Sequence, residues 1–253
     1  MSDKKVTREA VIRTLNKALK PLSYAQALYE GGAIAFNRLD EWSDIDLYLV
    51  VDDDKVDAAF KSVEEALERL SPIKQKFEVK QLPWPEVSQA FYKLKNASEY
   101  MLIDLAVIKS TCSEKFLEPE IHGEAVFYFN KSDAIKMRKL GRESLNRNLQ
   151  EKLTRLNARF AMFNVFVQKE INRGNFIEAL GLYHSLTFGS IVDALRIRHS
   201  PFHHDFKTRY IRYELPTEIT RKLERLYFVK DAKDLQQKYL EASKWFRELL
   251  DQS

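Results

Sequence analysis

The sequence predicts an α+β protein, in which a mixed sheet with flanking helices is followed by an all-helical bundle. Two observations support this prediction. Up to Lys131, short apolar runs of strand length alternate with amphipathic helical patterns and with glycine or proline breaks. From Ala134 to the end, almost every segment has apolar residues at the helical spacing of three or four. We therefore expect two domains, residues 1–131 and residues 132–253.

The first half begins with a helical pattern that Pro21 ends, and a second helical pattern ends before Pro72. The run Asp52-Asp53-Asp54 precedes this second helix, and we interpret it as a solvated acidic cap that binds no metal. The expected helices cover residues 7–20, 52–70 and 87–94. The expected strands cover residues 25–29, 46–51, 76–82, 99–109 and 125–129.

The second half opens with apolar side chains that recur every three or four residues from Leu145 to Val167, which we interpret as core. Gly174, in the sequence Arg173-Gly174-Asn175, has the position at which glycine commonly ends a helix. Further helices are expected over residues 176–198, 217–226 and 231–250.

The composition limits the class of protein. The chain has 253 residues and 45% hydrophobic content, enough for one large or two modest cores. Its net charge of +4 is mild, so nucleic acid is not an expected partner. The single cysteine, Cys112, excludes an intramolecular disulfide and a thiolate zinc cluster. The first residues carry no apolar leader and no run reaches membrane-spanning length, so we expect a cytoplasmic protein without a membrane partner.

Two aspartates, Asp44 and Asp46, stand at the start of the strand expected to reach Val51. Residues at positions i and i+2 of a strand point to the same face, so both carboxylates would project together. Carboxylates this close repel each other unless a cation lies between them. Mg²⁺ prefers oxygen ligands and is commonly held by one or two carboxylates plus substrate phosphates. The pattern predicts a metal site on a buried strand.

A glycine pair, Gly31-Gly32, stands about a dozen residues before the aspartates. Glycines have no Cβ atom, so their backbone N–H groups can approach a polyphosphate closely. A short helix over residues 33–36 would add an anion-binding N-terminus. The plain alternative is a turn followed by an ordinary strand with solvent-facing aspartates.

A third carboxylate interrupts the apolar strand expected over residues 99–109. Aspartate is rare in strands and costly to bury without a partner, which makes Asp104 our candidate for a third site residue. Glu78 is the alternative, because it interrupts the preceding strand in the same way. We favour Asp104, since its flanking residues are more continuously apolar.

These motifs resemble the signature of the polymerase-β-like nucleotidyltransferase superfamily, and the layout most resembles its lincosamide and aminoglycoside groups. The resemblance covers nearly the whole chain in layout. At residue level it depends on Gly31-Gly32, where the usual form is Gly-Ser, on Ser43-Asp44-Ile45-Asp46, on Asp104 and on Arg173-Gly174-Asn175. The resemblance implies transfer of a nucleoside monophosphate, usually AMP from ATP, to a hydroxyl group, with release of pyrophosphate.

The resemblance also implies roles for these residues. Asp44, Asp46 and Asp104 would be catalytic and hold Mg²⁺, most simply as a two-metal site. Gly31, Gly32 and Ser43 would bind the nucleoside triphosphate. Gly32 replaces the serine of the usual form, whose hydroxyl touches a phosphate.

The acceptor is expected to be a small hydroxylated molecule bound by the helical half, and an antibiotic is one candidate. Transfer to a protein or to RNA is a further alternative, which the small net charge disfavours for RNA. The rival from another class is a non-catalytic nucleotide-binding or toxin–antitoxin-type interaction module. The sequence leaves a homodimer open.

Other polar residues of the helical half are weaker candidates for a functional role. We interpret the basic side chains as solvated, the single acidic ones as surface residues, and His184 as a helix histidine with a satisfied hydrogen bond. The His203-His204-Asp205 run has no third ligand at zinc spacing, so we expect a polar loop. The basic residues weighed as phosphate ligands are Lys169, Arg173 and Arg209, and the acidic ones weighed as the general base are Glu178 and Asp193.

Overall fold

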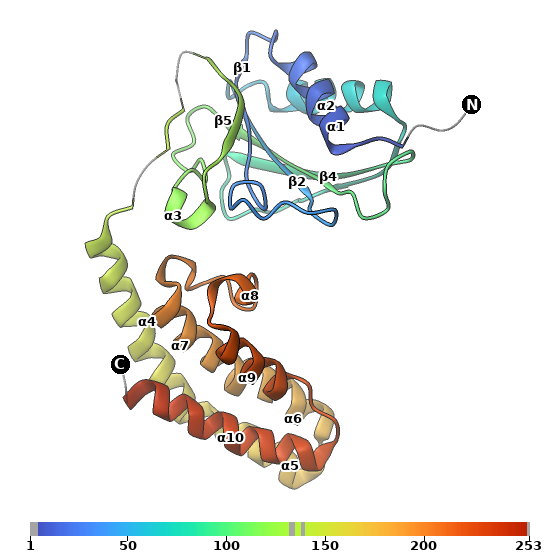
Figure 1. Cartoon of the computed structure of the whole chain (residues 1–253). Coiled ribbons are helices and arrows are strands. Elements are labelled where there is room, and N and C mark those ends of the chain that lie inside the picture. The colour runs from blue at the N-terminus through green and yellow to red at the C-terminus, as the bar shows by residue number, and fades with distance from the viewer. Residues whose placement is uncertain (1–4, 132–134, 138–139, 252–253) are drawn as a thin grey trace. The chain divides into compact units, whose positions relative to one another are not determined.

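The computed structural model describes residues 5–131, 135–137 and 140–251. The chain divides into two compact units, Met1–Lys139 and Leu140–Ser253 (Figure 1). The predicted boundary at Lys131 stays a prediction, because residues 132–134 next to it lie outside the described part. The predicted fold class is confirmed, since the first unit is a mixed sheet with flanking helices and the second is helical.

The first unit is built on a six-stranded sheet of order β3-β4-β5-β2-β1-β6. Strands β2 and β5 are parallel, and every other neighbouring pair is antiparallel. The predicted strands are all present, with bounds that differ by a few residues. The strands are β1 (Ala25–Glu30), β2 (Ile45–Val51), β3 (Ile73–Glu78), β4 (Val87–Leu94), β5 (Ile103–Lys109) and β6 (Val126–Asn130).

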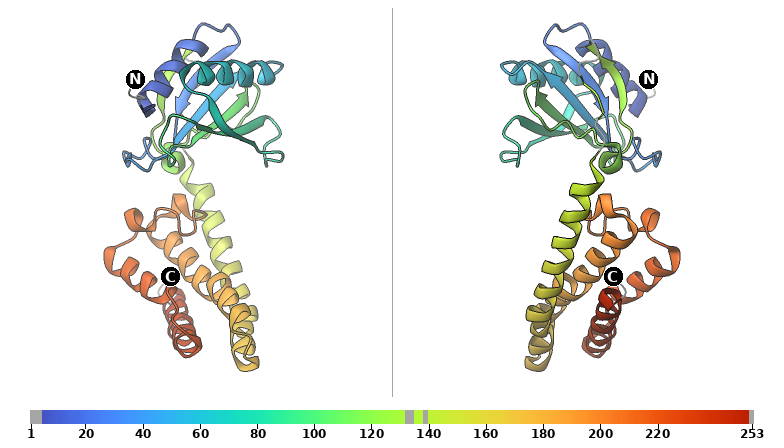
Figure 2. Two further views of the ribbon diagram at one scale, coloured as in Figure 1. Left: turned by 90° about the vertical axis from the view of Figure 1, so that its right-hand side faces the viewer. Right: turned by 90° about the vertical axis from the view of Figure 1, so that its left-hand side faces the viewer.

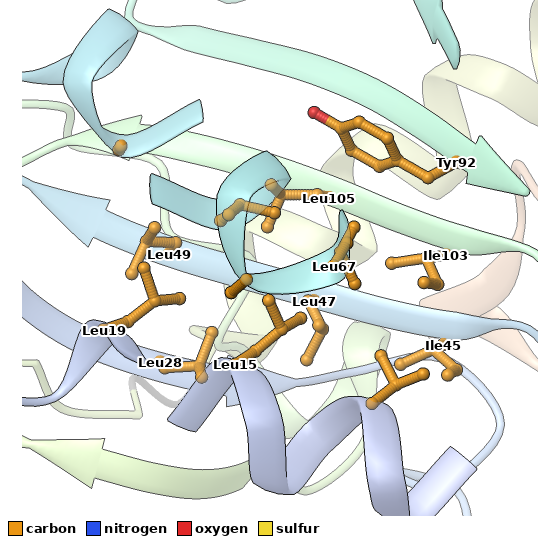
Figure 3. Close-up of a cluster of buried hydrophobic side chains, with 14 of the residues drawn as sticks. Leu15, Leu19, Leu28, Ile45, Leu47, Leu49, Leu67, Tyr92, Ile103 and Leu105 are labelled. Carbon is orange, nitrogen blue, oxygen red and sulfur yellow. The ribbon is translucent and has the colours of Figure 1, made fainter. Parts of the chain in front are cut away.

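Two helices, α1 (Arg8–Leu19) and α2 (Val56–Leu70), lie against one face of this sheet (Figures 1 and 2). The Thr7 hydroxyl starts α1 by accepting a hydrogen bond from the Ala10 N–H at 3.3 Å. Alternate strand residues point to this face, so the aliphatic side chains of β2 and β5 meet those of the helices in one core (Figure 3). A short helix, α3 (Pro119–His122), precedes β6.

Two local predictions for this unit are wrong. Residues 87–94 form strand β4, not a helix, because β4 pairs with both β3 and β5 and buries alternate residues Ala90, Tyr92 and Leu94. Residues 33–36 form turns, not a helix. There the Arg38 N–H donates to the Ala33 carbonyl, five residues back, at 2.8 Å, which does not continue as a helical ladder.

The second unit is helical over its described residues. The predicted long helix up to residue 173 is divided at Asn164 into α4 and α5, and its end at Gly174 is confirmed by a left-handed φ of 77° there. The predicted helix over residues 176–198 contains a π-helical segment, Tyr183–Phe188. The α-helices are α4 (Arg142–Phe163), α5 (Val165–Arg173), α6 (Phe176–Leu182), α7 (Gly189–His199), α8 (Ile211–Glu214), α9 (Thr217–Tyr227) and α10 (Ala232–Asp251).

A buried polar network joins the helices of this unit around the break at Asn164. The Asn164 side chain donates to the Ser243 hydroxyl at 3.0 Å and accepts from the Thr187 hydroxyl at 2.5 Å. Because each buried polar group has a partner, the network fixes the packing of α5, the π-helical segment and α10. Among the helices of the described residues, none combines the length and the apolar character needed to cross a bilayer.

Candidate active site

The pairing of β2 with β5 brings two of the predicted site residues together. Asp46 and Asp104 are direct partners in the parallel register of these strands. Neighbouring strands lie about 4.8 Å apart, and paired residues of a parallel register point their side chains to the same face of the sheet. The two carboxylates therefore start from adjacent backbone positions on the same face of the sheet.

That face is opposite to the one covered by α1 and α2. Ile45 and Leu47, on either side of Asp46, are buried in the core with the helices, and Ile103 and Leu105 flank Asp104 in the same way. Both aspartates are half-buried. The apolar neighbours thus anchor the strands, while alternation turns the carboxylates to the face that the helices leave open.

The glycine pair forms a turn directly beside Asp46. The Gly31 N–H donates to the Asp46 carbonyl at 3.0 Å. Gly32 has a left-handed φ of 63°, and a Cβ atom there would lie 1.8 Å from the Asp46 Oδ2 atom. Only glycine combines this backbone conformation with so close an approach, so the glycine turn and the Asp46 carboxylate form one site.

Asp44 lies just before β2 and is exposed. Its backbone carbonyl accepts a hydrogen bond from the Arg8 guanidinium at 2.7 Å, which ties the start of β2 to α1. Partial removal from water raises the pKa of the Asp44 carboxyl above its usual value, and the positive charges of Arg8 and Lys93 act in the opposite direction. As the pH falls, Asp44 therefore loses its charge earlier than a fully solvated aspartate.

Arg8 also forms a buried ion pair that sequence reasoning missed. Its guanidinium pairs with Glu30, the last residue of β1, which is fully buried and accepts a further hydrogen bond from the Tyr128 hydroxyl. Glu30 directly precedes Gly31, so this cluster fixes the strand end from which the glycine turn starts. The sequence carried no signal for it, because Arg8 is an ordinary basic residue on a helix.

Gln89 is the second missed residue. Its side-chain amide donates to the Asp104 Oδ1 atom at 2.7 Å across the antiparallel pairing of β4 with β5. This bond orients the Asp104 carboxylate. Reading residues 87–94 as a helix hid this contact, because only a strand places Gln89 beside β5.

The Ser43 hydroxyl takes part in the loop before β2. It donates to the Asp40 Oδ1 atom at 2.7 Å, and the same oxygen accepts from the Trp42 N–H at 3.1 Å. This local turn holds the backbone that enters β2. Nucleotide binding by Ser43 stays a prediction.

Glu78, the alternative third carboxylate, lies elsewhere. It is on the edge strand β3, three strands from β2, which is roughly 14 Å across the sheet. Its carboxylate is paired with Lys76. The geometry therefore favours Asp104 as the neighbour of Asp46.

The first unit contains a second group of metal-ligand type. Glu114, Glu118 and His122 are half-buried and offer ligand atoms that lie within 4.8 Å of one another. His122 and Glu118 face each other at 3.9 Å across one helical turn. These residues could hold a cation, although sequence analysis did not single them out, because their spacing matches no familiar motif.

Most polar residues weighed in the helical unit have structural partners. His203 contacts Glu214 at 3.0 Å, and His204 and Asp205 surround the Lys152 ammonium, so this run builds a loop as expected. Arg173 pairs with Glu170 beside the helix end. Lys169 lies over the Phe166 ring, Arg209 lies over Phe206 and Tyr210, and Glu178 is exposed.

Asp193 is buried, so its interpretation as a surface residue is wrong. Together with His184 it lines a cavity of about 410 Å³ within the helical unit. The Lys207 ammonium bonds both oxygens of the Asp193 carboxylate, at 2.9 and 2.8 Å. On another wall, His184 stacks on Tyr227 at a centroid distance of 4.6 Å. The π-helical segment supplies His184 and Ser185, and such segments often occur at functional sites.

The aspartate site fits a hard divalent cation. Two carboxylates on adjacent strand positions supply the oxygen donors that Mg²⁺ prefers. The space beside Asp46 Oδ2 is kept only because residue 32 has no Cβ. Asp46 and Asp104 would hold such a cation, and Asp44 is close enough in sequence to contribute.

We expect Gly32→Ala to destabilise the first unit by roughly 2–3 kcal/mol, because it combines a left-handed backbone with a collision at Asp46. Gly174→Ala is the matched control, since Gly174 also has a left-handed φ but a Cβ there meets nothing within 4 Å. Its cost should be about 1 kcal/mol. Urea unfolding of both variants gives the comparison, and equal losses would contradict the close approach at Asp46.

Comparisons with known proteins add little to this geometry. No protein-family model and no curated protein matches the chain. Among solved structures, the chain is similar to a STING-associated CdnE c-di-GMP synthase from Capnocytophaga granulosa, with 12% sequence identity and a TM-score of 0.31. The alignment covers 96% of this chain and 85% of that chain. A likeness at this TM-score supports no functional statement, and the resemblance to the lincosamide and aminoglycoside groups stays a prediction.

Proposed function

We propose that this protein is a Mg²⁺-dependent nucleotidyltransferase that moves a nucleoside monophosphate, AMP from ATP in the simplest case, onto a hydroxyl of a small molecule. The observation that carries the proposal is the pairing of Asp46 with Asp104 beside the glycine turn at Gly32. Carboxylates next to a glycine turn serve a reaction in which cation-bound phosphates must be held close to the backbone.

In this reaction the acceptor oxygen forms a bond to the α-phosphorus, and the bond from that phosphorus to the α,β-bridging oxygen breaks. Pyrophosphate leaves, and the hydroxyl proton must be removed. Bound Mg²⁺ supplies neutralisation of the phosphate charge. Asp46 and Asp104 would hold the cation, with Asp44 as a further ligand, and Asp104, oriented by Gln89, would also align the acceptor hydroxyl and accept its proton.

The acceptor would bind in the cavity of the helical unit. Its volume of about 410 Å³ is in the range of small-molecule sites. The stacked His184–Tyr227 pair offers a flat apolar wall, and the Asp193–Lys207 pair offers hydrogen-bonding groups to a hydroxylated compound. These features favour a small polyol with an apolar face over a macromolecule.

The test is a transfer assay with each of the four ribonucleoside triphosphates labelled at the α-phosphate. The protein is incubated with Mg²⁺ and with pools of small hydroxylated compounds that include aminoglycosides and lincosamides. We expect a labelled adduct and an equal amount of pyrophosphate, both lost in EDTA. Nucleotide binding without any adduct would favour a non-catalytic binding module instead.

A further inference from the structure

We propose that Trp42 and Tyr100 form a stacking surface for the nucleobase of the triphosphate bound at the aspartate site. This inference rests on the proposed function and adds the residues that would recognise the base. It concerns the first unit alone.

The two aromatic side chains contact each other and remain open to solvent. Their ring centroids are 5.0 Å apart at an interplanar angle of 81°, which is an edge-to-face pair. Trp42 is still 59% exposed and Tyr100 is 57% exposed. Aromatic side chains of this size normally bury most of their surface, so two that stay exposed together indicate a surface for a ligand.

The pair belongs to the two loops that lead into the strands of the aspartate site, β2 and β5. Trp42 precedes Asp44 by two residues, so their Cα atoms are at most about 7.6 Å apart. Tyr100 precedes Asp104 by four residues. The Ile45 N–H donates to the Leu102 carbonyl at 2.9 Å, which joins the two loops where β2 and β5 begin.

Both loops are held by local hydrogen bonds. The Trp42 N–H donates to the Asp40 carboxylate at 3.1 Å, and the Met101 N–H donates to the Ser98 carbonyl at 3.1 Å. The rings are therefore presented by ordered backbone, which lowers the entropy cost of stacking on them. An edge-to-face pair also leaves ring faces open, and any of the four nucleobases can stack on such a face.

A third exposed aromatic residue of this unit lies away from the aspartates. Phe77 is 63% exposed, but it lies on the edge strand β3, three strands from β2. It contacts Phe91 on the neighbouring strand at 6.4 Å. Phe77 therefore serves as a matched control for an exposed ring outside the site.

Affinity measurements distinguish the contribution of the base to binding from that of the phosphates. Calorimetric titrations with Mg²⁺–ATP and with Mg²⁺–tripolyphosphate use the full-length protein and its Trp42→Ala, Tyr100→Ala and Phe77→Ala variants. We expect Trp42→Ala to weaken ATP binding about thirtyfold, the middle of the range for loss of one stacked base. Tripolyphosphate binding should be unchanged, as should ATP binding by Phe77→Ala. Trp42→Phe should retain part of the ATP affinity.

Fluorescence gives a second readout that needs no change at the proposed surface. In the Trp84→Phe/Trp245→Phe protein, Trp42 is the only tryptophan. Mg²⁺–ATP should change its emission, and Mg²⁺–tripolyphosphate should not.

The outcomes distinguish this inference from the proposed function. If Mg²⁺–ATP binds equally well to the wild type and to Trp42→Ala, the stacking surface is wrong while nucleotide binding stands. If Trp42→Ala loses affinity equally for ATP and for tripolyphosphate, the residue acts on the phosphate site and the inference also fails. If no triphosphate binds the wild type, both proposals fall.

Discussion

Replacement of Asp46 by asparagine is expected to lower nucleotidyl transfer by about 10³-fold or more while the protein stays folded. Asparagine keeps the size of the side chain and its place beside Gly32 and Asp104, but it removes one anionic oxygen from the cation site. A loss of about 4 kcal/mol of transition-state stabilisation corresponds to this change in rate. The free energy of unfolding should change by less than about 1 kcal/mol, because one of two neighbouring negative charges is removed.

Asp57→Asn is the matched control for this experiment. It makes the same change in net charge at an exposed aspartate in the first turn of α2, on the helix-covered side of the sheet. Its transfer rate should equal that of the wild type. Normal transfer by a folded Asp46→Asn protein would contradict the proposed cation site.

Replacement of Arg196 by methionine is expected to destabilise the helical unit by about 3–5 kcal/mol. Arg196 is fully buried and pairs with Glu214, and it donates to the Lys207 carbonyl at 3.0 Å and to the Ser200 hydroxyl at 3.1 Å. It thereby anchors the loop after α7, which also carries Lys207 of the cavity wall. Methionine fills similar volume but removes the guanidinium that pairs with Glu214 and donates to these acceptors, and breaking a buried ion pair costs this much.

An exposed ion pair provides the comparison. Arg225 pairs with Glu241 on the surface, where the two side chains are 60% and 39% exposed. Arg225→Ala should cost less than about 1 kcal/mol. Urea unfolding followed by Trp245 emission, in a background in which Trp42 and Trp84 are replaced by phenylalanine, reports on the helical unit in both variants. Similar losses in the two would contradict the anchoring role of Arg196.

The sequence predicted the architecture well because hydrophobic periodicity reflects burial on one face of each element. The alternation from Ile45 to Val51 belongs to a core in the structure. Of the stripe predicted from Leu145 to Val167, the residues Leu156, Phe160 and Val167 belong to the helical core, whereas Phe163 is 42% exposed. The helix expected over residues 87–94 is wrong because a mixed stretch of eight residues, in which Ser88, Gln89 and Lys93 interrupt the apolar positions, fits either period. Partner strands on both sides decide the outcome. The break at Asn164 likewise depends on tertiary contacts, since its side chain bonds residues 23 and 79 positions away.

For the candidate site, the sequence identified the charged residues but not their supports. Asp46 and Asp104 could be singled out because carboxylates are costly in apolar strands, yet their direct pairing depends on β5 lying next to β2. The sequence does not single out Gln89 and Arg8 in this way, because an amide on a strand and a guanidinium on a helix are common at the surface and have no burial cost there. Their contacts arise only from strand order and from the packing of α1 on the sheet.

The most direct test of the central claim is a calorimetric titration of ATP into the wild type and into Asp104→Asn, each with Mg²⁺ and with EDTA. The claim is that the neighbouring carboxylates of β2 and β5 bind a triphosphate through a divalent cation. We expect the wild type to bind ATP only when Mg²⁺ is present, and Asp104→Asn to bind Mg²⁺–ATP at least about tenfold more weakly, which is roughly 1.4 kcal/mol. ATP binding that is equally strong in EDTA and unaffected by Asp104→Asn would contradict the claim.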